Sequence, residues 1–223
     1  NWSLMSKKKR NNSGGIKART ERQEQLINAI YQNQMTITTG FSGTGKTFIS
    51  ASLAANSLLR GRVNKIILTR PNVASGPTLG FRPGDMHDKM GEWFYEVYKV
   101  IAQAIGMETL KQEMEYGSIE LAPFETMRGR SFDDCFVLLD EAQNITPHEM
   151  KMFVTRIGDA RVVVNGDLMQ SDLTKKKSGL STAVNIIKQY NMDVPIIEFQ
   201  EEDIVRGGLC KEWIVNFMDY EKN

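Results

Sequence analysis

Residues 40–47 read Gly-Phe-Ser-Gly-Thr-Gly-Lys-Thr, and this stretch decides the fold that the sequence predicts. It matches the pattern Gly-x-x-x-x-Gly-Lys-[Ser or Thr] at every fixed position. A β-branched run at 35–39 precedes it, and a helix-forming stretch from 46 to about 60 follows it. A phosphate-binding loop requires this strand–turn–helix context, so we predict such a loop here.

The residues of this loop suit a bound nucleotide. Glycines let successive backbone N–H groups point at phosphate oxygens, and the helix N-terminus adds a favourable dipole. We expect Lys46 to place its charge on the β- and γ-phosphates and Thr47 to offer a hydroxyl to Mg²⁺, so ATP and Mg²⁺ are the expected ligands. The expected nucleotide-binding residues are Gly40, Phe41, Ser42, Gly43, Thr44, Gly45, Lys46, Thr47 and Phe48.

An apolar run at 135–139 predicts a second buried strand, which ends in Asp140 and Glu141. Phosphoryl transfer needs a metal-holding carboxylate at such a strand end, and Asp140 is the predicted one, together with Thr47. Glu141 is the predicted base that accepts a proton from the attacking water. A small-molecule kinase must exclude water and has no use for this base. The alternative for the pair is a helix-capping acid beside a surface acid.

Gly166 and Asp167 follow another buried strand, predicted at 161–165. Their polar groups should emerge at the sheet edge where ligands of open α/β folds bind. We expect Gln170 to contact the γ-phosphate or the attacking water, and Gln143 is a second candidate for this role. The alternative is a Gly-Asp pair that only forms a turn.

The composition is that of one globular domain: 223 residues, of which 41% are hydrophobic and 25% charged. No apolar run reaches the roughly 18 residues of a membrane span, and the polar, basic start does not resemble a signal peptide. Cys135 and Cys210 lie far apart, as do His87 and His148, so no zinc site is expected. Two reduced thiols fit a cytoplasmic protein.

The net charge of +1 is unevenly distributed. Residues 1–22 hold seven basic residues and one acid, a net charge of +6, which leaves −5 on the rest of the chain. We expect 1–19 to form a basic flexible arm and 20–223 to form a single nucleotide-binding domain. The arm could contact nucleic-acid phosphates, and the alternative is a solvated leader.

Short β-branched runs alternate with amphipathic stretches, which predicts an α/β fold of three layers with a mostly parallel central sheet. Thr20 and Gln23 have the spacing of a capping box at the start of the first helix. The segment 70–86, with six Gly and Pro residues, predicts a long functional loop. Further strands are expected at 65–69, 118–121 and 195–199. Further helices are expected at 20–31, 88–105, 147–157, 179–190 and 203–220.

Together these segments resemble the PhoH (phosphate-starvation-inducible) ATPase family, which is related to superfamily-one helicase motor domains. The resemblance covers about residues 20–210. It depends on the joint order of the phosphate-binding loop and the segments 68–71, 79–85, 127–130, 139–144, 150–157, 166–170 and 203–206. It implies a RecA-type core, with one strand inserted between the phosphate-loop strand and the Asp-Glu strand.

The resemblance also implies ATP hydrolysis, often linked to RNA or single-stranded DNA, by a ring-shaped homo-oligomer, for which a hexamer is favoured. Gln23 matches the helicase glutamine that reads adenine, which would explain a preference for ATP. As a capping-box residue alone, Gln23 would be structural.

A chain of this length has room for one motor domain, whereas helicases of this superfamily close two around one ATP. An arginine that neutralises the transferring group accelerates phosphoryl transfer, in cis or in trans. Five arginines are candidates to enter a neighbour's site or to contact nucleic acid, and the alternative for each is a surface salt bridge. We favour Arg206, as a catalytic residue, and the Arg128/Arg130 pair. The other two candidates are Arg70 and Arg156.

The leading functional hypothesis is Mg-dependent ATP hydrolysis coupled to the remodelling or unwinding of RNA or single-stranded DNA. The loop at 70–86 would line the strand-binding channel. No aromatic stacking platform is obvious, because Phe81, Trp93 and Phe124 are expected in the core. The alternative is an ATP-gated switch or assembly factor that acts on protein partners. A nucleotide or small-molecule kinase is the third hypothesis, and Glu141 argues against it.

Overall fold

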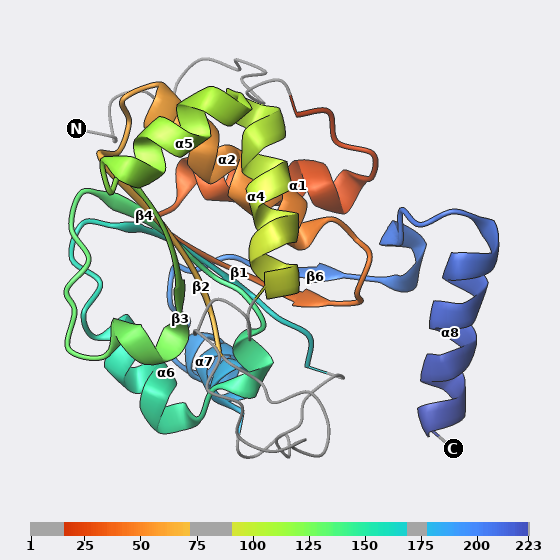
Figure 1. The fold of residues 1–223 in the computed structure, drawn as a ribbon. Helices are drawn as coiled ribbons and strands as arrows, with labels where there is room; N and C mark the ends of the chain where they lie inside the picture. The colour runs from red at the N-terminus through yellow and green to blue at the C-terminus, as the bar shows by residue number, and fades with distance from the viewer. Residues whose placement is uncertain (1–15, 72–90, 169–177, 223) are drawn as a thin grey trace, which may run out of the picture.

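A computed structural model describes residues 16–71, 91–168 and 178–222. Six strands form one sheet in the order β3-β2-β4-β5-β1-β6, and every neighbouring pair is parallel (Figure 1). The strands are β1 (Met35–Gly40), β2 (Lys65–Arg70), β3 (Ile119–Pro123), β4 (Cys135–Leu139), β5 (Arg161–Asn165) and β6 (Ile196–Phe199).

Helices cover both faces of the sheet, so the predicted three-layer α/β architecture is confirmed (Figure 1). One face carries α1 (Glu21–Gln32), α2 (Lys46–Leu59), α4 (Gly91–Ile105) and α5 (Met107–Glu115). The other face carries α6 (Pro147–Val154) and α7 (Gly179–Gln189). The last helix, α8 (Gly208–Lys222), extends beyond β6 and away from the layers (Figure 1).

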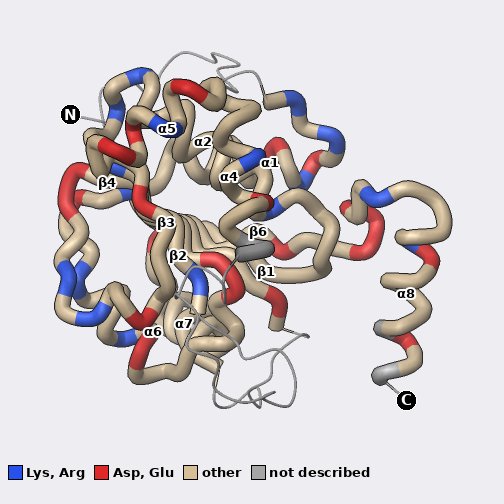
Figure 2. Tube along the Cα trace, in the orientation of Figure 1, with Lys and Arg blue, Asp and Glu red and all other residues tan. Residues whose placement is uncertain are grey.

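The interior strand β4 has the unbroken apolar sequence that a strand covered on both faces requires, and all five of its residues are buried. Phe136 and Leu138 pack on the α1–α2–α4 side, and Val137 and Leu139 pack on the α6–α7 side. Each such side chain stabilises the fold by roughly 2 kcal/mol. No charged residue lies along β1 or β4 (Figure 2). The apolar strand therefore fixes the position of the carboxylates that follow it.

Strand β5 lies between β1 and β4, which confirms the inserted strand that the family resemblance implies. The registers are aligned, because Val164 pairs with Ile37 of β1 on one side and with Leu139 of β4 on the other. The carboxyl ends of the three strands are thus level. The phosphate loop, the Asp-Glu pair and the Gly-Asp turn consequently emerge at one edge of the sheet.

Several expected elements differ in extent. Helix α5 was not expected, because it is only nine residues long and Leu110 is its only buried residue. The helix expected at 203–220 begins at Gly208, since a 3₁₀ turn, η4 (Glu201–Asp203), and four irregular residues precede it. The helix expected at 147–157 ends at Val154.

Other expectations fall partly outside the described residues. This applies to residues 1–15 of the predicted basic arm, to most of the loop at 70–86 with Phe81, and to the side chain of Trp93. Phe124 is buried as expected, at the start of the 3₁₀ turn η1 (Phe124–Met127). Within the described parts of the chain, no helix is long and apolar enough to cross a membrane.

Candidate nucleotide-binding site

The predicted phosphate loop connects β1 to α2, and it needs glycine at both of its ends. Gly40 and Gly45 have φ angles of 100° and 87°, which are left-handed values that other residues rarely adopt. A Cβ atom at Gly40 would lie 2.0 Å from the carbonyl oxygen of Phe199, and one at Gly45 would lie 2.9 Å from Nε2 of Gln23. The loop is therefore pressed against β6 on one side and against α1 on the other.

Lys46, the first residue of α2, points into this loop. Its Nζ donates to the carbonyl oxygens of Gly40 at 2.6 Å and of Phe41 at 2.5 Å. The Thr44 hydroxyl, which donates to the carbonyl of Phe41 at 2.9 Å, lies 3.4 Å from the same ammonium. The loop thus holds the charge that was predicted to contact phosphate. Ser42 and Phe48, also predicted here, are both exposed.

Burial lowers the pKa of the Lys46 ammonium from its usual value. The carboxylates of Asp167, Asp140 and Glu141, in decreasing order, oppose this shift. Residues from α2, from the end of β4 and from the end of β5 are therefore close enough to interact electrostatically. The structure brings together the predicted phosphate loop, the Asp-Glu pair and the Gly-Asp turn.

Thr47 and Asp140 lie side by side, as expected of two residues that share an ion. The Thr47 hydroxyl donates to the Asp140 carboxylate, with distances of 3.0 and 3.1 Å to its two oxygens. Hard oxygen groups of this kind suit Mg²⁺. Among the described residues, no group of three or more His, Cys, Asp and Glu side chains could hold a metal ion by itself. An ion at this point would complete its shell with phosphate oxygens and water, which is the usual way that Mg²⁺ binds.

Glu141 adopts a left-handed backbone conformation, with φ 55° and ψ 37°. This conformation is uncommon for a residue other than glycine, and non-glycine outliers of this kind cluster at functional sites. It opens the 3₁₀ turn η2 (Ala142–Asn144), which places Gln143 beside the Glu141 side chain. The Nε2 of Gln143 donates to Oε2 of Glu141 at 2.6 Å. The two acids therefore have different partners: Asp140 contacts Thr47, and Glu141 contacts Gln143.

The predicted role of Gln170 lies outside the described residues, so it stays a prediction. Gln143, the second candidate for that role, is buried, and its Oε1 accepts a hydrogen bond from the Asp167 backbone N–H at 3.0 Å. The bond between Gln143 and Asp167 joins the ends of β4 and β5. Sequence spacing did not predict this contact.

Gln23 forms only one half of the predicted capping box. The Thr20 hydroxyl accepts from the Gln23 backbone N–H at 3.2 Å, as expected. The Gln23 side chain does not return to Thr20, because its Oε1 accepts from the Arg19 backbone N–H at 2.8 Å and its Nε2 donates to the Thr44 carbonyl at 2.8 Å. Gln23 is buried and ties α1 to the phosphate loop. The adenine contact that the resemblance implies stays a prediction.

A buried polar cluster beneath the loop was missed by sequence reasoning. The Thr38 hydroxyl of β1 donates to Oδ1 of Asn165 at the end of β5, at 2.8 Å. Asn165 Nδ2 and the Ser50 hydroxyl of α2 are 3.4 Å apart. All three side chains are fully buried. The available signal was the occurrence of polar residues in two buried strands, Thr38 within β1 and Asn165 at the end of β5.

Arg130 forms an ion pair rather than an isolated cation. Its Nη1 and Nη2 lie 2.6 and 3.0 Å from the two carboxylate oxygens of Glu120 on β3, and Lys65 adds a contact of 2.8 Å. The Arg130 hydrogen bonds, followed by those of Lys65, lower the pKa of Glu120 to about 2. This geometry matches the salt-bridge alternative for Arg130. A role in a neighbour's site would require the pair to open.

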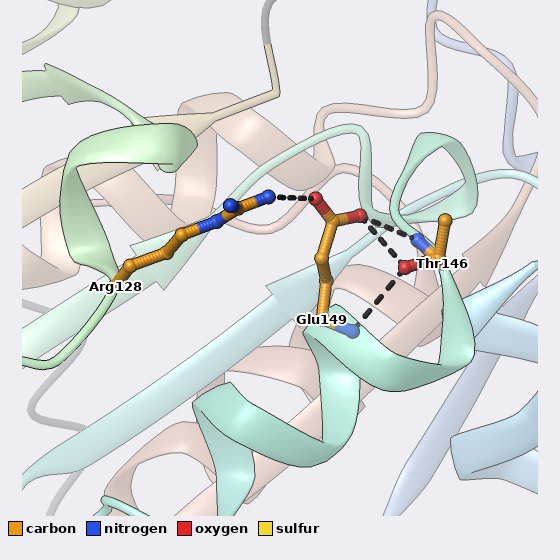
Figure 3. A network of polar contacts seen from close by, with 3 residues as sticks. All are labelled: Arg128, Thr146 and Glu149. Atoms are coloured by element: carbon orange, nitrogen blue, oxygen red, sulfur yellow. Dashed lines mark hydrogen bonds and ion pairs between the residues drawn. The ribbon is translucent and has the colours of Figure 1, made fainter.

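Arg128 forms an ion pair with Glu149, with Nη2 3.3 Å from Oε1 (Figure 3). The other oxygen of Glu149 accepts from the backbone N–H and the hydroxyl of Thr146, at 2.8 and 2.9 Å, in the capping box of α6. The Arg128 side chain is 66% exposed, which leaves most of it open to solvent.

Arg206 lies beside the phosphate loop of its own chain. A Cβ atom at Gly43 would be 3.0 Å from Cγ of Arg206, and the backbone N–H of Val205 donates to the Gly43 carbonyl at 3.1 Å. Arg70 ends β2 at the same sheet edge, directly after Thr69, whose carbonyl accepts from the backbone N–H of Asp140 at 2.8 Å. Arg156 lies beyond α6, and its carbonyl accepts from the backbone N–H of Phe132 at 3.1 Å.

A protein-family model described as PhoH-like protein matches residues 15–219. The chain belongs to the PhoH-like family. Protein PhoH of Escherichia coli K12 is 44% identical to it over 200 residues, which cover 88% of this chain and 56% of that protein. The PhoH-like protein of Bacillus subtilis is 40% identical over 201 residues, covering 89% of this chain and 63% of that protein. The resemblance found in the motifs is confirmed.

This PhoH-like chain thus spans less than two thirds of the relatives it matches. Its fold is similar to that of the UvsW helicase of bacteriophage T4, with a TM-score of 0.50 and 13% identity, over 82% of this chain and 61% of the helicase chain. A likeness at this identity concerns the fold alone, and it agrees with the predicted RecA-type core.

Proposed function

We propose that this chain binds ATP with Mg²⁺ and hydrolyses it. The observation that supports the proposal best is the convergence of a buried lysine, a hydroxyl–carboxylate pair and a separate glutamate at one sheet edge. Each group has a defined task in phosphoryl transfer. Lys46 and Thr47 begin α2, and Asp140 and Glu141 directly follow β4.

The loop and Lys46 bind the triphosphate. On nucleotide binding, phosphate oxygens replace the carbonyl oxygens of Gly40 and Phe41 as acceptors for the ammonium. Thr47 and Asp140 would hold Mg²⁺, which supplies charge neutralisation on the phosphate oxygens when bound.

Glu141 accepts a proton from a water molecule whose oxygen attacks the γ-phosphorus. The bond from the γ-phosphorus to the β–γ bridging oxygen breaks, and ADP and phosphate are the products. Because Asp140 is paired with Thr47, Glu141 is available for this proton. The carboxylate that serves the ion and the carboxylate that serves the water are thus adjacent residues with separate partners.

The test is Glu141→Gln, which removes the base and keeps the shape of the side chain. We expect phosphate release to fall by about 10²–10⁴-fold, while equilibrium binding of a fluorescent ATP analogue stays close to that of the parent chain. Hydrolysis at the parental rate by Glu141→Gln would falsify the assigned base. Loss of hydrolysis and binding together would indicate a structural role for Glu141.

We also propose that hydrolysis is coupled to single-stranded RNA or DNA, in a cytoplasmic protein. Family membership, the helicase-like fold and the +6 charge of residues 1–22 support this coupling. A polynucleotide should raise ATP turnover, and the stimulation should weaken as salt is added because phosphate contacts release counterions.

A protein partner is the second candidate, and helix α8 favours it. Its exposed apolar side chains, Leu209, Trp213, Phe217 and Tyr220, follow helical spacing, and the Trp213 and Phe217 rings lie 5.4 Å apart. Acids outnumber bases three to two within this helix, which does not suit contacts with a phosphate backbone. If no polynucleotide alters ATP turnover, the ATP-gated switch becomes the better hypothesis.

Activity in an oligomeric ring, with an arginine supplied in trans, is the remaining part of the proposal. Turnover per protomer should rise with protein concentration. Mixing Lys46→Ala subunits with Arg206→Ala subunits should partly restore turnover if Arg206 acts in a neighbour's site. Since Arg206 lies beside its own loop, loss of activity without rescue would assign it to that loop instead.

A further inference from the structure

Gln143 connects two parts of the site that are distant in sequence. It lies in η2, two residues after Glu141, and is 2% exposed. Its Nε2 donates to Oε2 of Glu141 at 2.6 Å, and its Oε1 accepts from the backbone N–H of Asp167 at 3.0 Å. One buried amide therefore joins the proposed base to the turn that follows β5.

The chemistry of its neighbours fixes the orientation of this amide. A backbone N–H can only donate, so the oxygen of Gln143 must face Asp167. The amide NH₂ then faces Glu141, whose carboxylate oxygen accepts the hydrogen bond. Hydrogen bonds to a charged group are shorter and stronger than neutral ones, in agreement with the 2.6 Å distance.

The turn after β5 also packs directly against this amide. A Cβ atom at Gly166 would lie 2.8 Å from Oε1 of Gln143 and 2.5 Å from Cδ2 of Leu180. A side chain at position 166 would require Gln143 or Leu180 to shift. A displacement of the turn would therefore move the amide, and through it the carboxylate of Glu141.

We propose that Gln143 is a positioning residue that holds the Glu141 carboxylate in place to accept the proton from water, and that it links this position to the turn at Gly166 and Asp167. The inference depends on the proposed hydrolysis at this site. It adds that the turn after β5 controls the rate of hydrolysis through the base and not through nucleotide affinity.

Two substitutions separate the two hydrogen bonds. Gln143→Met keeps the size of the side chain and removes both bonds. Gln143→Glu keeps an acceptor for the Asp167 N–H and places an anion beside Glu141. We expect both to lower kcat by about 10–100-fold, with KM and the Kd of a fluorescent ATP analogue changed by less than about 3-fold.

A matched control is Asn56→Leu, which removes another buried amide, one that donates to the Ser52 carbonyl at 2.9 Å within α2. We expect the control to retain parental kcat. Thermal unfolding of each variant shows whether it is folded. If Gln143→Met does not fold, the result for Gln143→Glu decides.

A double-mutant cycle with Glu141→Gln tests whether Gln143 influences hydrolysis through Glu141. If Gln143 acts through Glu141, Gln143→Met should cause no further loss of single-turnover phosphate release in the Glu141→Gln background. An equal loss in both backgrounds would overturn the inference, because Gln143 would then act independently of the base. Parental kcat in both Gln143 variants would overturn it as well and leave the proposed hydrolysis intact. A parent chain that does not hydrolyse ATP would overturn both proposals.

Discussion

The charged residues around the phosphate loop and those beside β3 form two clusters that differ in composition and in arrangement. In the β3 cluster, Glu120 contacts both Arg130 and Lys65, and the guanidinium meets the carboxylate through two parallel contacts. In the loop cluster, the Lys46 ammonium contacts backbone carbonyls, while three carboxylates act on it.

The pKa of Glu120 and the pKa of Lys46 are both lowered, but for different reasons. Opposite charge lowers the pKa of Glu120 to about 2, so the β3 cluster favours its charged form. Burial is the largest influence on Lys46 and lowers its pKa, so the loop cluster disfavours its charged form. Groups that are perturbed by burial in a polar site are candidates for function, whereas paired surface charges contribute to stability. The two clusters should therefore respond differently to substitution.

The largest expected difference is between the two lysines. Lys46→Ala should lower the rate of phosphate release by on the order of 10²–10³-fold, because it removes a charge that faces the transferring group. Lys65→Ala, the matched control in the β3 cluster, should retain parental activity. A coupled phosphate assay at saturating ATP measures both, and equal losses would contradict the division between the clusters.

The next effect concerns the metal. Asp140→Asn keeps the size of the side chain and removes the charge beside Thr47. The Mg²⁺ concentration that gives half-maximal turnover should rise by about 10–100-fold, which is the usual loss of metal affinity when a group around the first ligands is replaced. Glu120→Gln should leave the Mg²⁺ dependence unchanged. A Mg²⁺ titration that is the same for Asp140→Asn and the parent chain would remove Asp140 from the ion site.

A smaller effect, on stability, is expected for Glu120→Gln. Its carboxylate is partly exposed, so solvent screening limits the loss to about 1 kcal/mol, or a fall in Tm of roughly 2–4 °C for a domain of this size. The pKa of Glu120 is lowered from 4.5 to about 2, so the contribution is present at pH 7 and disappears as pH falls through that interval. Unfolding curves of the parent and the variant should converge near pH 2, and a constant difference would contradict the ion-pair origin.

The smallest effect is expected for Arg128→Ala. This side chain is 66% exposed and makes one contact of 3.3 Å, so its loss should cost less than about 0.5 kcal/mol. Thr146→Ala, which removes a cap of α6 on the same network, should cost about 1 kcal/mol. Thermal melts in parallel rank the two, and a larger loss for Arg128→Ala would show that its ion pair is more than a surface contact.

Local sequence patterns sufficed for the layers of the fold and for the residues at the strand ends. The spacing within residues 40–47 predicts the loop, and the apolar run before Asp140 predicts a buried strand. Both features are local, since each depends on consecutive residues. Helix α5 was not anticipated, because only Leu110 is buried and tertiary contacts decide its conformation.

The contacts between side chains were harder to predict, for the same reason. Gln143 meets Asp167 across 24 residues of sequence, and Thr38 meets Asn165 across 127. The spacing of residues along the sequence cannot predict such pairs, because the order of the strands in the sheet brings them together. Arg130 is a similar case: the sequence offered it for a neighbour's site, for nucleic acid or for a salt bridge, and only the structure shows that Glu120 on β3 pairs with it.

The hydrogen bond from Gln23 to the Thr44 carbonyl connects α1 directly to the phosphate loop. The residues of α1 and those of the phosphate loop thereby become mechanically connected. Cleavage or detachment of α1 would remove this contact from the loop. ATP affinity should then fall, so it can be used to measure whether α1 is packed against the loop. The amide of Gln23, together with the packing of α1 on the sheet, therefore connects the residues before Thr20 to the phosphate loop.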